Sequence, residues 1–540
     1  MPVYRPRIAY FLDAVDSVRA QSLGDWELIL ADDRSDDASL DAELNRLAAL
    51  DPRIRVVRRE DNGGISEASN SALALARGEF VVLMDNDDLL TTDALESMAA
   101  AIDADPDADY LYSDEEKIEV GPGLARRYFD AFRKPDWSPE RLRAQMYCGH
   151  LSVLRRSLVA AVGGFDRRFD GSQDHDLVLR VTERARRVVH VPRILYRWRV
   201  SPSSTAGSGA AKPYTWDAGV AAVDAHLARV GIDGAAARGR ITNTVRISRR
   251  LPAGVRVSVI IPTNGASGRI RGRRRVHVLG AVRSLLARAG HEALEVVVVW
   301  DSGMDRRILD RLRRIAGDRL VLVEYDRPFN FSEKCNLGFL ASSGDVVVLL
   351  NDDIEVLSDR FVAELCAPLL EPGVGMTGAA LSYEDGSVQH GGHVYADHGW
   401  AEAYRGAGPD EPGYFFSLRI NREVAGVTAA CAALTRARYA QIGGLDTGLP
   451  GNFNDVDLSY KVRRTGGRIL WLAEVRATHF ESRTRDRSYH PAEAARLVAR
   501  WGLPERDPYL AQPWRHDYPA DLDDQVRRPA TIAAVGAPPA

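Results

Sequence analysis

The chain has 540 residues, of which 45% are hydrophobic and 27% are charged, and 71 basic against 75 acidic side chains give a formal net charge of −4. This balance is typical of a globular protein and argues against a general nucleic-acid binder, which needs a strongly basic surface. The cysteines are too scattered for a disulfide framework or a zinc spacing, and no apolar stretch approaches the roughly 18 residues of a membrane span. The N-terminus lacks the layout of a signal peptide, so we expect a cytoplasmic protein.

The first part of the chain alternates strand-like and helix-like segments, which predicts a parallel sheet with helices on both faces. Its opening residues, Met1 to Tyr4, follow no apolar run, so the chain begins where a first strand would end. A sheet without that central strand would leave backbone groups unpaired. We therefore expect either a start further upstream or another segment in that place.

The next two predicted strands both end in acidic residues. Residues 26–33 end in Asp33, and residues 81–88 end in Asp85-Asn86-Asp87-Asp88. Carboxylates two residues apart at a strand end suit a hard divalent cation that also binds a diphosphate, whereas the alternative is a helix cap or a solvated turn. Asp33 either accepts a hydrogen bond from a ribose hydroxyl or a base, or caps a helix.

A second acidic pattern, Gln173-Asp174-His175-Asp176, precedes a helical run. Asp174 is there either a helix N-cap or a general base that deprotonates a sugar hydroxyl. The stretch 201–209, rich in Ser, Gly and Pro, then predicts a linker. We expect domains at 1–205 and 255–485, a linker at 206–254, and a C-terminal extension at 486–540 that is disordered past Arg528.

The second part of the chain repeats the first. An offset of 266 residues relates Ser66 to Ser332 and Asp85 to Asn351, and later motifs correspond as well. The equivalent polar groups are Asp301, Asn351-Asp352-Asp353 and Asn454-Asp455-Val456-Asp457. A period this long indicates duplicated domains rather than a solenoid, whose repeats are about 20–50 residues.

Together these motifs resemble the family 2 glycosyltransferases over nearly all of both halves. The resemblance implies an α/β fold made of two tandem GT-A domains, the Rossmann-like fold of nucleotide-diphospho-sugar transferases. It also implies a divalent cation, Mg²⁺ or Mn²⁺, a nucleoside-diphosphate sugar donor and inverting transfer to a glycan or lipid-linked glycan acceptor. The tandem arrangement resembles bacterial enzymes of O-antigen and other surface polysaccharides, for which peripheral contact with the inner membrane face is open.

The resemblance also implies roles for individual residues. The expected metal ligands are Asp85, Asp87, Asp353 and His479, and the expected catalytic bases are Asp174 and Asp455. The residues expected to bind the nucleotide sugar are Pro2, Tyr4, Asp33, Asp85, Pro262, Asn264, Asp301 and Asp352. Domain one is expected to carry Arg197 at the place of His479, and domain two carries Asn351 at the place of Asp85.

Several alternatives remain at this stage. One domain could be a noncatalytic glycan-binding or docking module, whereas a nucleotidyltransferase would need a Gly-rich basic loop that Pro262-Thr263-Asn264-Gly265 does not supply. His390, His393 and His398 fit no usual zinc spacing, so we expect a flexible loop there. The basic cluster 269–275 is either a solvated loop or a contact for anionic head groups or a substrate phosphate.

Overall fold

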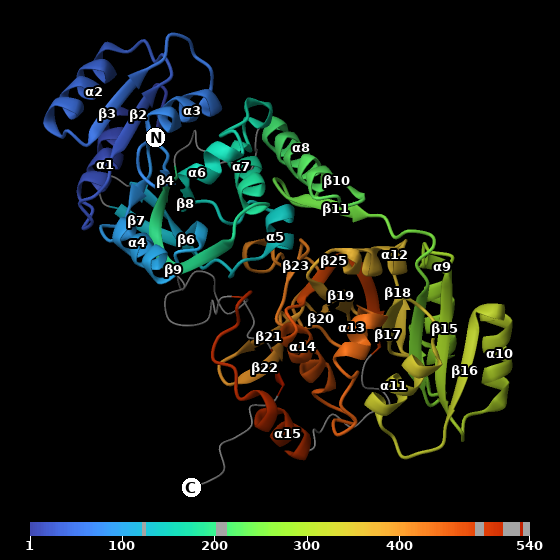
Figure 1. The fold of residues 1–540 in the computed structure, drawn as a ribbon. Coiled ribbons are helices and arrows are strands. Elements are labelled where there is room, and N and C mark those ends of the chain that lie inside the picture. The colour runs from blue at the N-terminus through green and yellow to red at the C-terminus, as the bar shows by residue number, and fades with distance from the viewer. Residues whose placement is uncertain (121–125, 201–212, 481–490, 511–529, 533–540) are drawn as a thin grey trace, which may run out of the picture. The chain divides into compact units, whose positions relative to one another are not determined.

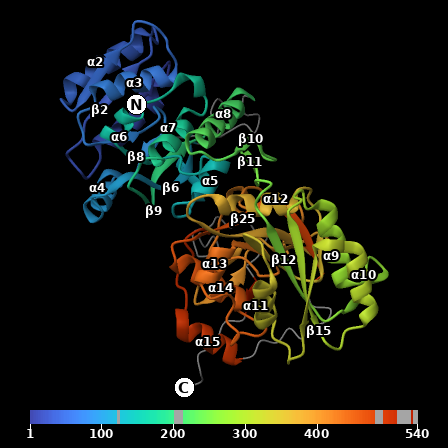
Figure 2. The ribbon, with the colours of Figure 1, turned by 45° about the vertical axis from the view of Figure 1, so that its right-hand side comes forward.

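The computed structural model describes residues 1–120, 126–200, 213–480, 491–510 and 530–532 (Figures 1 and 2). The chain forms two compact units, one holding Met1–Ile247 and the other most of the chain from Ser248. Each unit combines helices with a mixed sheet, which confirms the predicted α/β class. Among the described helices, none is both long and apolar enough to cross a membrane.

The second unit contains one large sheet in the strand order β16-β15-β12-β17-β24-β19-β25-β18. Its opening strand β12 is buried at every residue and pairs in parallel with both β15 and β17, so the carboxyl ends of these three strands meet at one edge. The bounds of the strands in this sheet are β12 Val257–Thr263, β15 Leu294–Asp301, β16 Leu320–Tyr325, β17 Val346–Leu350, β18 Ile354–Val356, β19 Val374–Ser382, β20 Val388–His390, β23 Arg422–Glu423, β24 Cys431–Thr435 and β25 Arg468–His479.

Helices and small sheets complete the second unit. The helices are α9 His277–Arg288, α10 Arg306–Ala316, α11 Phe331–Ala341, α12 Phe361–Cys366, α13 Arg436–Gln441, α14 Asn454–Arg464 and α15 Pro491–Trp501. The basic cluster 269–275 lies on a hairpin of β13 Ser267–Ile270 and β14 Arg273–Val276. A further small sheet contains β21 His393–Ala396, β22 Gly399–Glu402 and β26 Ala530–Ile532.

The first unit has counterparts of the main strands of the large sheet, but they form two separate sheets. The three strands β1-β2-β3 form one sheet, and β4-β8-β6-β9-β5 form another, with β7 beside β6. The bounds are β1 Pro2–Val3, β2 Leu28–Asp32, β3 Ile54–Arg58, β4 Phe80–Leu83, β5 Leu89–Leu90, β6 Ala108–Val120, β7 Arg126–Phe132, β8 Ser152–Arg155 and β9 Arg187–Arg199. The helices are α1 Ile8–Arg19, α2 Ala38–Leu50, α3 Ile65–Leu75, α4 Ala94–Ala104, α5 Pro139–Ala144, α6 Arg156–Ala161, α7 Gln173–Thr182 and α8 Pro213–Arg229.

Strand register explains the division. Pro2 pairs with Ala31 as Pro262 pairs with Val299, so β1 matches the last residues of β12, as the sequence predicts. The residues of β12 that pair with β17 are 257–260, and all of them precede the position equivalent to Met1. Within the described residues β1 therefore pairs with β2 alone and β4 with β8 alone.

The segment expected as a linker, 206–254, contains ordered elements from residue 213 onward. Helix α8 is followed by a two-stranded sheet of β10 Gly234–Arg238 and β11 Val245–Arg249. Helix α8 lies beside α7, where Ser172 Oγ donates to the Thr215 carbonyl at 2.7 Å and His226 bonds Glu183 at 2.7 Å. The expected disordered tail lies outside the described residues except for β26.

An asparagine clamp occurs at the same place in both units. The side chain of Asn70 exchanges two hydrogen bonds with the backbone of Phe165, and Asn336 does the same with Leu445. The glycine before each turn, Gly164 and Gly444, has a positive φ, and a Cβ there would lie within about 2.6 Å of the asparagine oxygen. The clamp thus needs glycine. It joins α3 to the segment before Asp174 in the first unit and α11 to the segment before Asp455 in the second.

Candidate active sites

The carboxyl ends of the parallel strands bring predicted residues of the second unit together. Lys334 of α11 donates from Nζ to Asp301 Oδ1 at 2.7 Å and to the Thr263 carbonyl at 2.9 Å. Thr263 Oγ1 in turn donates to Asp352 Oδ2 at 2.5 Å. The ends of β12, β15 and β17 are therefore joined by one polar network, and its cation, Lys334, is a residue that the sequence analysis missed.

The expected metal-site residues of the second unit also meet. His479 Nε2 lies 3.1 Å from Asp353 Oδ1 and 3.3 Å from Nδ2 of the Asn351 side chain. Burial alone would raise the pKa of Asp353, but His479, together with His277 and a backbone hydrogen bond, lowers it, so the net pKa is below its usual value. Burial and the charge of Asp353 raise the pKa of Asp352 to about 7.

The donor set of this site fits a hard divalent cation. Carboxylate and carbonyl oxygens are preferred ligands of Mg²⁺, and an imidazole nitrogen is also accepted by Mn²⁺. The Asn351 Oδ1 atom is buried and has no hydrogen-bond partner among the described residues, so an unsatisfied oxygen belongs to the side chain that contacts His479. A cation would satisfy it, so the residues present fit the group that the sequence predicts.

In the first unit the equivalent acids lie at the end of β4. The Asp85 side chain is 43% exposed, and its carboxylate lies 3.6 Å from His150 Nε2. Burial and the charge of Asp85 raise the pKa of Asp87. Asp88 is buried and accepts from the Tyr196 hydroxyl and the Arg199 amide at 2.7 Å each, which makes it a structural acid and leaves Asp85 and Asp87 for a cation.

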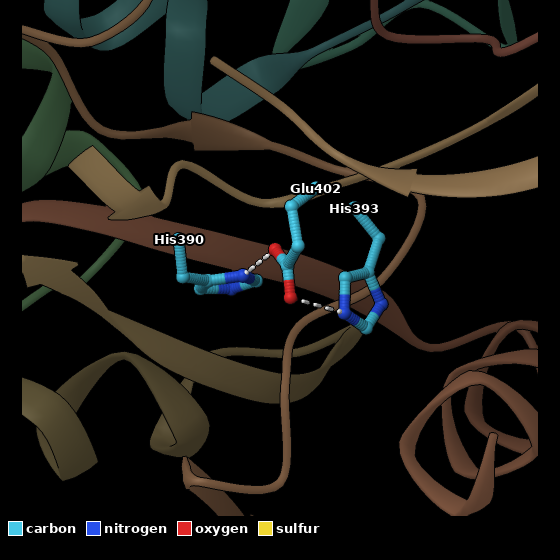
Figure 3. A group of neighbouring side chains, drawn as sticks. All are labelled: His390, His393 and Glu402. Atoms are coloured by element: carbon cyan, nitrogen blue, oxygen red, sulfur yellow. Dashed lines mark hydrogen bonds and ion pairs between the residues drawn. The ribbon is translucent and has the colours of Figure 1, made fainter. Parts of the chain in front are cut away.

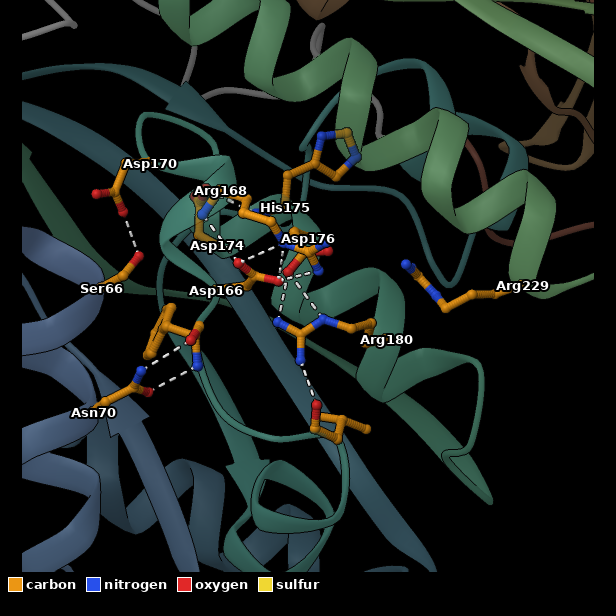
Figure 4. Close-up of polar contacts among 12 residues, drawn as sticks. Ser66, Asn70, Asp166, Arg168, Asp170, Asp174, His175, Asp176, Arg180 and Arg229 are labelled. Atoms are coloured by element: carbon orange, nitrogen blue, oxygen red, sulfur yellow. Dashed lines mark hydrogen bonds and ion pairs between the residues drawn. The ribbon is translucent and has the colours of Figure 1, made fainter.

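The two aspartates at the start of α7, Asp174 and Asp176, have different environments. Asp176 is fully buried and accepts from the Arg180 guanidinium at 2.9 and 2.5 Å, whereas Asp174 is half-buried and accepts from the His175 amide at 2.8 Å (Figure 4). Within the described part of the chain, Asp174 forms no ion pair. The Asp176 carboxylate is therefore occupied by Arg180 within the helix, whereas the Asp174 carboxylate remains accessible for the proton transfer that the sequence predicts.

The second unit repeats this division of labour. Asp457 is buried and contacts Lys461 at 3.0 Å and both Arg500 and the Trp501 indole at 2.8 Å. Asp455 is half-buried and accepts from the Val456 amide at 2.9 Å and the Ala429 amide at 3.4 Å. The roles of Asp174 and Asp455 as bases remain predictions, but their position relative to the buried acids is the same in both copies.

The segments expected to contact the nucleotide base lie beside the acidic strand ends. The Pro2 carbonyl accepts from Asn86 Nδ2 at 2.9 Å, and the Tyr4 side chain is 47% exposed. In the second unit Pro262 is buried within β12, while Asn264 is exposed and its side chain accepts from the Ala266 amide at 2.9 Å. Tyr4 and Asn264 are thus the accessible members of this set.

Asp33 and Asp301 differ in what holds them. Asp33 is buried and accepts from Arg59 at 2.8 Å and from the amides of Gly63 and Gly64 at 2.9 and 2.8 Å. Asp301 is 34% exposed and bonds Lys334. Neither acid caps the helix that follows its strand, because the partners of Asp33 lie between β3 and α3 and Lys334 lies in α11.

Strand register corrects one expected correspondence. Leu89 pairs with Arg197 in the first unit, and its equivalent Glu355 pairs with Thr478 in the second. The residue at the place of His479 is therefore Trp198 and not Arg197, which instead bonds Glu116 at 2.9 Å. The expectation for Arg197 was wrong because the loops between the copies differ in length, so sequence spacing alone misplaced the register.

The histidines at 390 and 393 do not lie in a flexible loop, contrary to the expectation. Both are buried at the ends of β20 and β21, and Glu402 of β22 lies between them (Figure 3). His390 Nδ1 bonds Glu402 Oε2, and His393 Nε2 lies 3.4 Å from Glu402 Oε1. The sequence could not reveal this cluster, because Glu402 belongs to no recognisable spacing with the histidines.

The three side chains of this cluster are partners of one another. The Thr428 amide donates to His390 Nε2 at 3.3 Å, so the proton of a neutral His390 is on Nδ1 and faces Glu402. In this tautomer His390 Nδ1, the nitrogen that faces Glu402, carries the proton and cannot bind a metal ion. The arrangement therefore favours a hydrogen-bonded network over a zinc site. Thr428 directly precedes Ala429, whose amide contacts Asp455, so the cluster supports the segment beside the predicted base.

Comparisons with known proteins identify the family of the chain. Residues 1–163 match the model described as glycosyl transferase family 2, and residues 252–503 match glycosyltransferase like family 2. The chain is 40% identical over 96% of its length to y4gI, an uncharacterized protein of Sinorhizobium fredii, and 32% identical over 94% to the O-antigen biosynthesis protein RfbC of Myxococcus xanthus. It spans 56% and 39% of those two proteins, so about half their length or less. One similar solved structure is Staphylococcus aureus TarS 1-349 with UDP, at 21% identity and a TM-score of 0.33, covering 42% of this chain and 63% of that one.

Proposed function

Because the chain belongs to the family 2 glycosyltransferases through both of its domains, we propose that each domain transfers a sugar from a nucleoside-diphosphate sugar to a glycan acceptor. The acceptor would be a growing bacterial surface polysaccharide, free or lipid-linked. The similarity to a protein named for O-antigen biosynthesis supports this substrate class. Contact with the membrane face through the basic hairpin of β13 and β14 is part of the same proposal.

One observation carries the proposal for the second domain: the predicted base and the predicted metal site share two adjacent residues of backbone. The Ala429 amide contacts Asp455 at 3.4 Å, and the Ala430 carbonyl accepts from the Asn351 amide at 2.9 Å. A sugar whose diphosphate lies on the cation at the strand end would therefore have its anomeric carbon close to Asp455. This is the arrangement that direct displacement by an acceptor hydroxyl requires.

The chain's residues would divide the reaction as follows. Asp174 or Asp455 takes the proton of the acceptor hydroxyl as that oxygen attacks the anomeric carbon. A divalent cation held by Asp85 and Asp87, or by Asp353 and His479, would offset the charge of the departing diphosphate. Inversion at the anomeric carbon follows from a single displacement and is part of the proposal.

The test is release of nucleoside diphosphate from a panel of UDP-, GDP- and dTDP-sugars with Mn²⁺ or Mg²⁺, for the wild type, Asp174→Asn and Asp455→Asn. We expect each variant to lose a different donor or linkage. Matched controls are Asp37→Asn and Asp305→Asn, which change an aspartate that caps another helix of the same domain. The proposal fails if the wild type releases no nucleoside diphosphate from any donor, or if both site variants keep full activity.

A second candidate keeps only one domain catalytic and makes the other a docking or glycan-binding module. The observation that favours it is the divided sheet of the first unit, in which β4 pairs with β8 alone among the described residues. Among the described residues, the strand that carries Asp85 and Asp87 thus has one hydrogen-bonded neighbour where β17 has two. The same variants decide this, because Asp174→Asn would then leave every product unchanged.

A further inference from the structure

We infer that the first domain binds its divalent cation through a histidine from a different segment of the fold than the second domain uses, and that this ligand is His150, just before β8. The inference rests on the proposed metal-dependent function. His150 belongs to none of the motifs that predict the site, and only the sheet register and the side-chain geometry point to it. Each domain would then have one imidazole at its cation, supplied by unrelated elements.

Register shows that the two histidines are not equivalent. Leu83 pairs with Ser152, and its counterpart Leu349 pairs with Ala432, so His150 corresponds to Ala430. At the place of His479 the first domain has Trp198, whose indole cannot bind a hard cation. The second domain thus has alanine where the first has histidine, and the first has tryptophan where the second has histidine.

The side chain of His150 is placed for ligation. Its Nε2 atom lies 3.6 Å from Asp85 Oδ2, and its ring stacks on Tyr196 with centroids 4.5 Å apart and planes 15° apart. The Tyr196 hydroxyl accepts from the Asp85 amide at 3.3 Å and donates to Asp88 at 2.7 Å. The stack therefore ties the imidazole to the strand end that carries the acids.

The backbone around His150 is also fixed. The buried Lys134 ammonium donates to the carbonyls of Cys148 and His150 at 2.6 and 2.5 Å. Glu115 accepts from Lys134 at 2.8 Å and from the His150 amide at 3.2 Å. Such support is what a ligand needs to hold its direction before the ion arrives.

The distances agree with a shared ion. Neighbouring ligands of an octahedral cation with bonds of about 2.1 Å lie about 3 Å apart. Asp353 and His479 already meet this spacing at 3.1 Å. Asp85 and His150 are 3.6 Å apart, and the exposed side chain of Asp85 can close the remainder by a small rotation.

The basic residues that bind Asp33 and Asp301 also come from different elements in the two domains, and this observation is independent of the histidines. Arg59 binds Asp33 in the first domain, and strand register places Tyr325 at its position in the second. Lys334 binds Asp301, and its counterpart by the sequence offset is Ala68. The duplicated sites therefore keep a group of given chemistry while changing the element that supplies it, which is what the inference states for the histidine.

The test is electron spin-echo spectroscopy of Mn²⁺ bound to the full chain, which detects a directly coordinated nitrogen without turnover. The variants are His479→Phe, His150→Phe and the double variant, with His291→Phe as a control distant from the acids. Phenylalanine at 150 keeps the stack on Tyr196 and removes the ligand. Mn²⁺ titrations by spin counting give the affinities, and thermal unfolding checks that each variant is folded.

We expect nitrogen coupling in the wild type, in the control and in both single variants, and none in the double variant. His150→Phe should weaken Mn²⁺ binding at one site by about tenfold or more, by analogy with the loss of a supporting ligand contact. Loss of all coupling in His479→Phe alone, or its persistence in the double variant, would overturn the inference. A wild type that binds no Mn²⁺ would instead refute the metal-dependent function itself.

Discussion

Replacement of Glu402 by glutamine should destabilise the second unit in a way that depends on pH. Glu402 is buried between His390 and His393 and is the shared acceptor of both. Burial alone would raise the pKa of Glu402, but the two imidazoles hold it well below its usual range. Burial lowers the pKa of His393, yet Glu402 and the more distant Asp455 and Asp507 raise it by more.

The magnitude follows from the geometry. Removing one partner of a buried ion pair costs about 3–5 kcal/mol, and the glutamine oxygen still accepts from His390, which returns about 1 kcal/mol. We therefore expect a loss of about 2–4 kcal/mol at pH 6. A histidine with a raised pKa contributes stability below its unfolded pKa of 6.5, and this contribution is lost as the pH rises through its folded pKa. The cost of Glu402→Gln should thus be smaller at pH 9 than at pH 6, because His393 in the wild type loses its proton as the pH rises through its raised pKa.

Calorimetric unfolding of the full chain at several pH values measures this. Glu423→Gln is the matched control, because Glu423 is also buried and pairs at 2.7 Å with Arg468, whose guanidinium does not titrate in this range. The control should lose the same stability at pH 6 and pH 9. If Glu402→Gln loses no unfolding free energy, or loses the same amount at pH 6 and pH 9 as the control does, the assignment of a charged His393 is refuted.

Three further outcomes are expected. Asp457→Asn should lower the free energy of unfolding by about 2 kcal/mol or more, because Lys461, Arg500 and Trp501 lose the charged acceptor that they share. Asp455→Asn should change it by less than about 1 kcal/mol and yet abolish transfer by the second domain; equal thermal shifts for the two would contradict the division of roles. Lys334→Met should reduce kcat/KM for the donor of the second domain by about 10- to 100-fold, because the charged donor to Asp301 and the Thr263 carbonyl is lost; unchanged donor kinetics would exclude this role. Chelation with EDTA should stop release of nucleoside diphosphate and Mn²⁺ should restore it, whereas full turnover in EDTA would exclude a catalytic cation.

The sequence predicted the architecture well because its strongest signals are local. Apolar runs closed by acids fixed the strands β4 and β17, and the repeated spacing between motifs identified two α/β domains of one family. The same spacing located the equivalent of each acid, and the register of β1 against β2 agrees with it. The Asn70 and Asn336 clamps lie at matched positions for the same reason.

The errors arose where a contact joins distant segments. The sequence predicted Arg197 as the equivalent of His479, whereas the pairing of β5 with β9 shows that the equivalent residue is Trp198. His390 and His393 were expected in a loop, because nothing in their spacing indicates that β22 would bring Glu402 between them.

By itself, the sequence determined the family, the duplication and the acids that close each strand, because those properties depend on residues a few positions apart. Only the tertiary structure decided which side chains complete each site. His150 reaches Asp85 from the segment before β8, while His479 reaches Asp353 from β25, and Arg59 and Lys334 approach equivalent aspartates from different elements. The physical reason is that a site constrains the position and chemistry of a group but not the strand that delivers it, so duplicated domains can keep the chemistry and change the source.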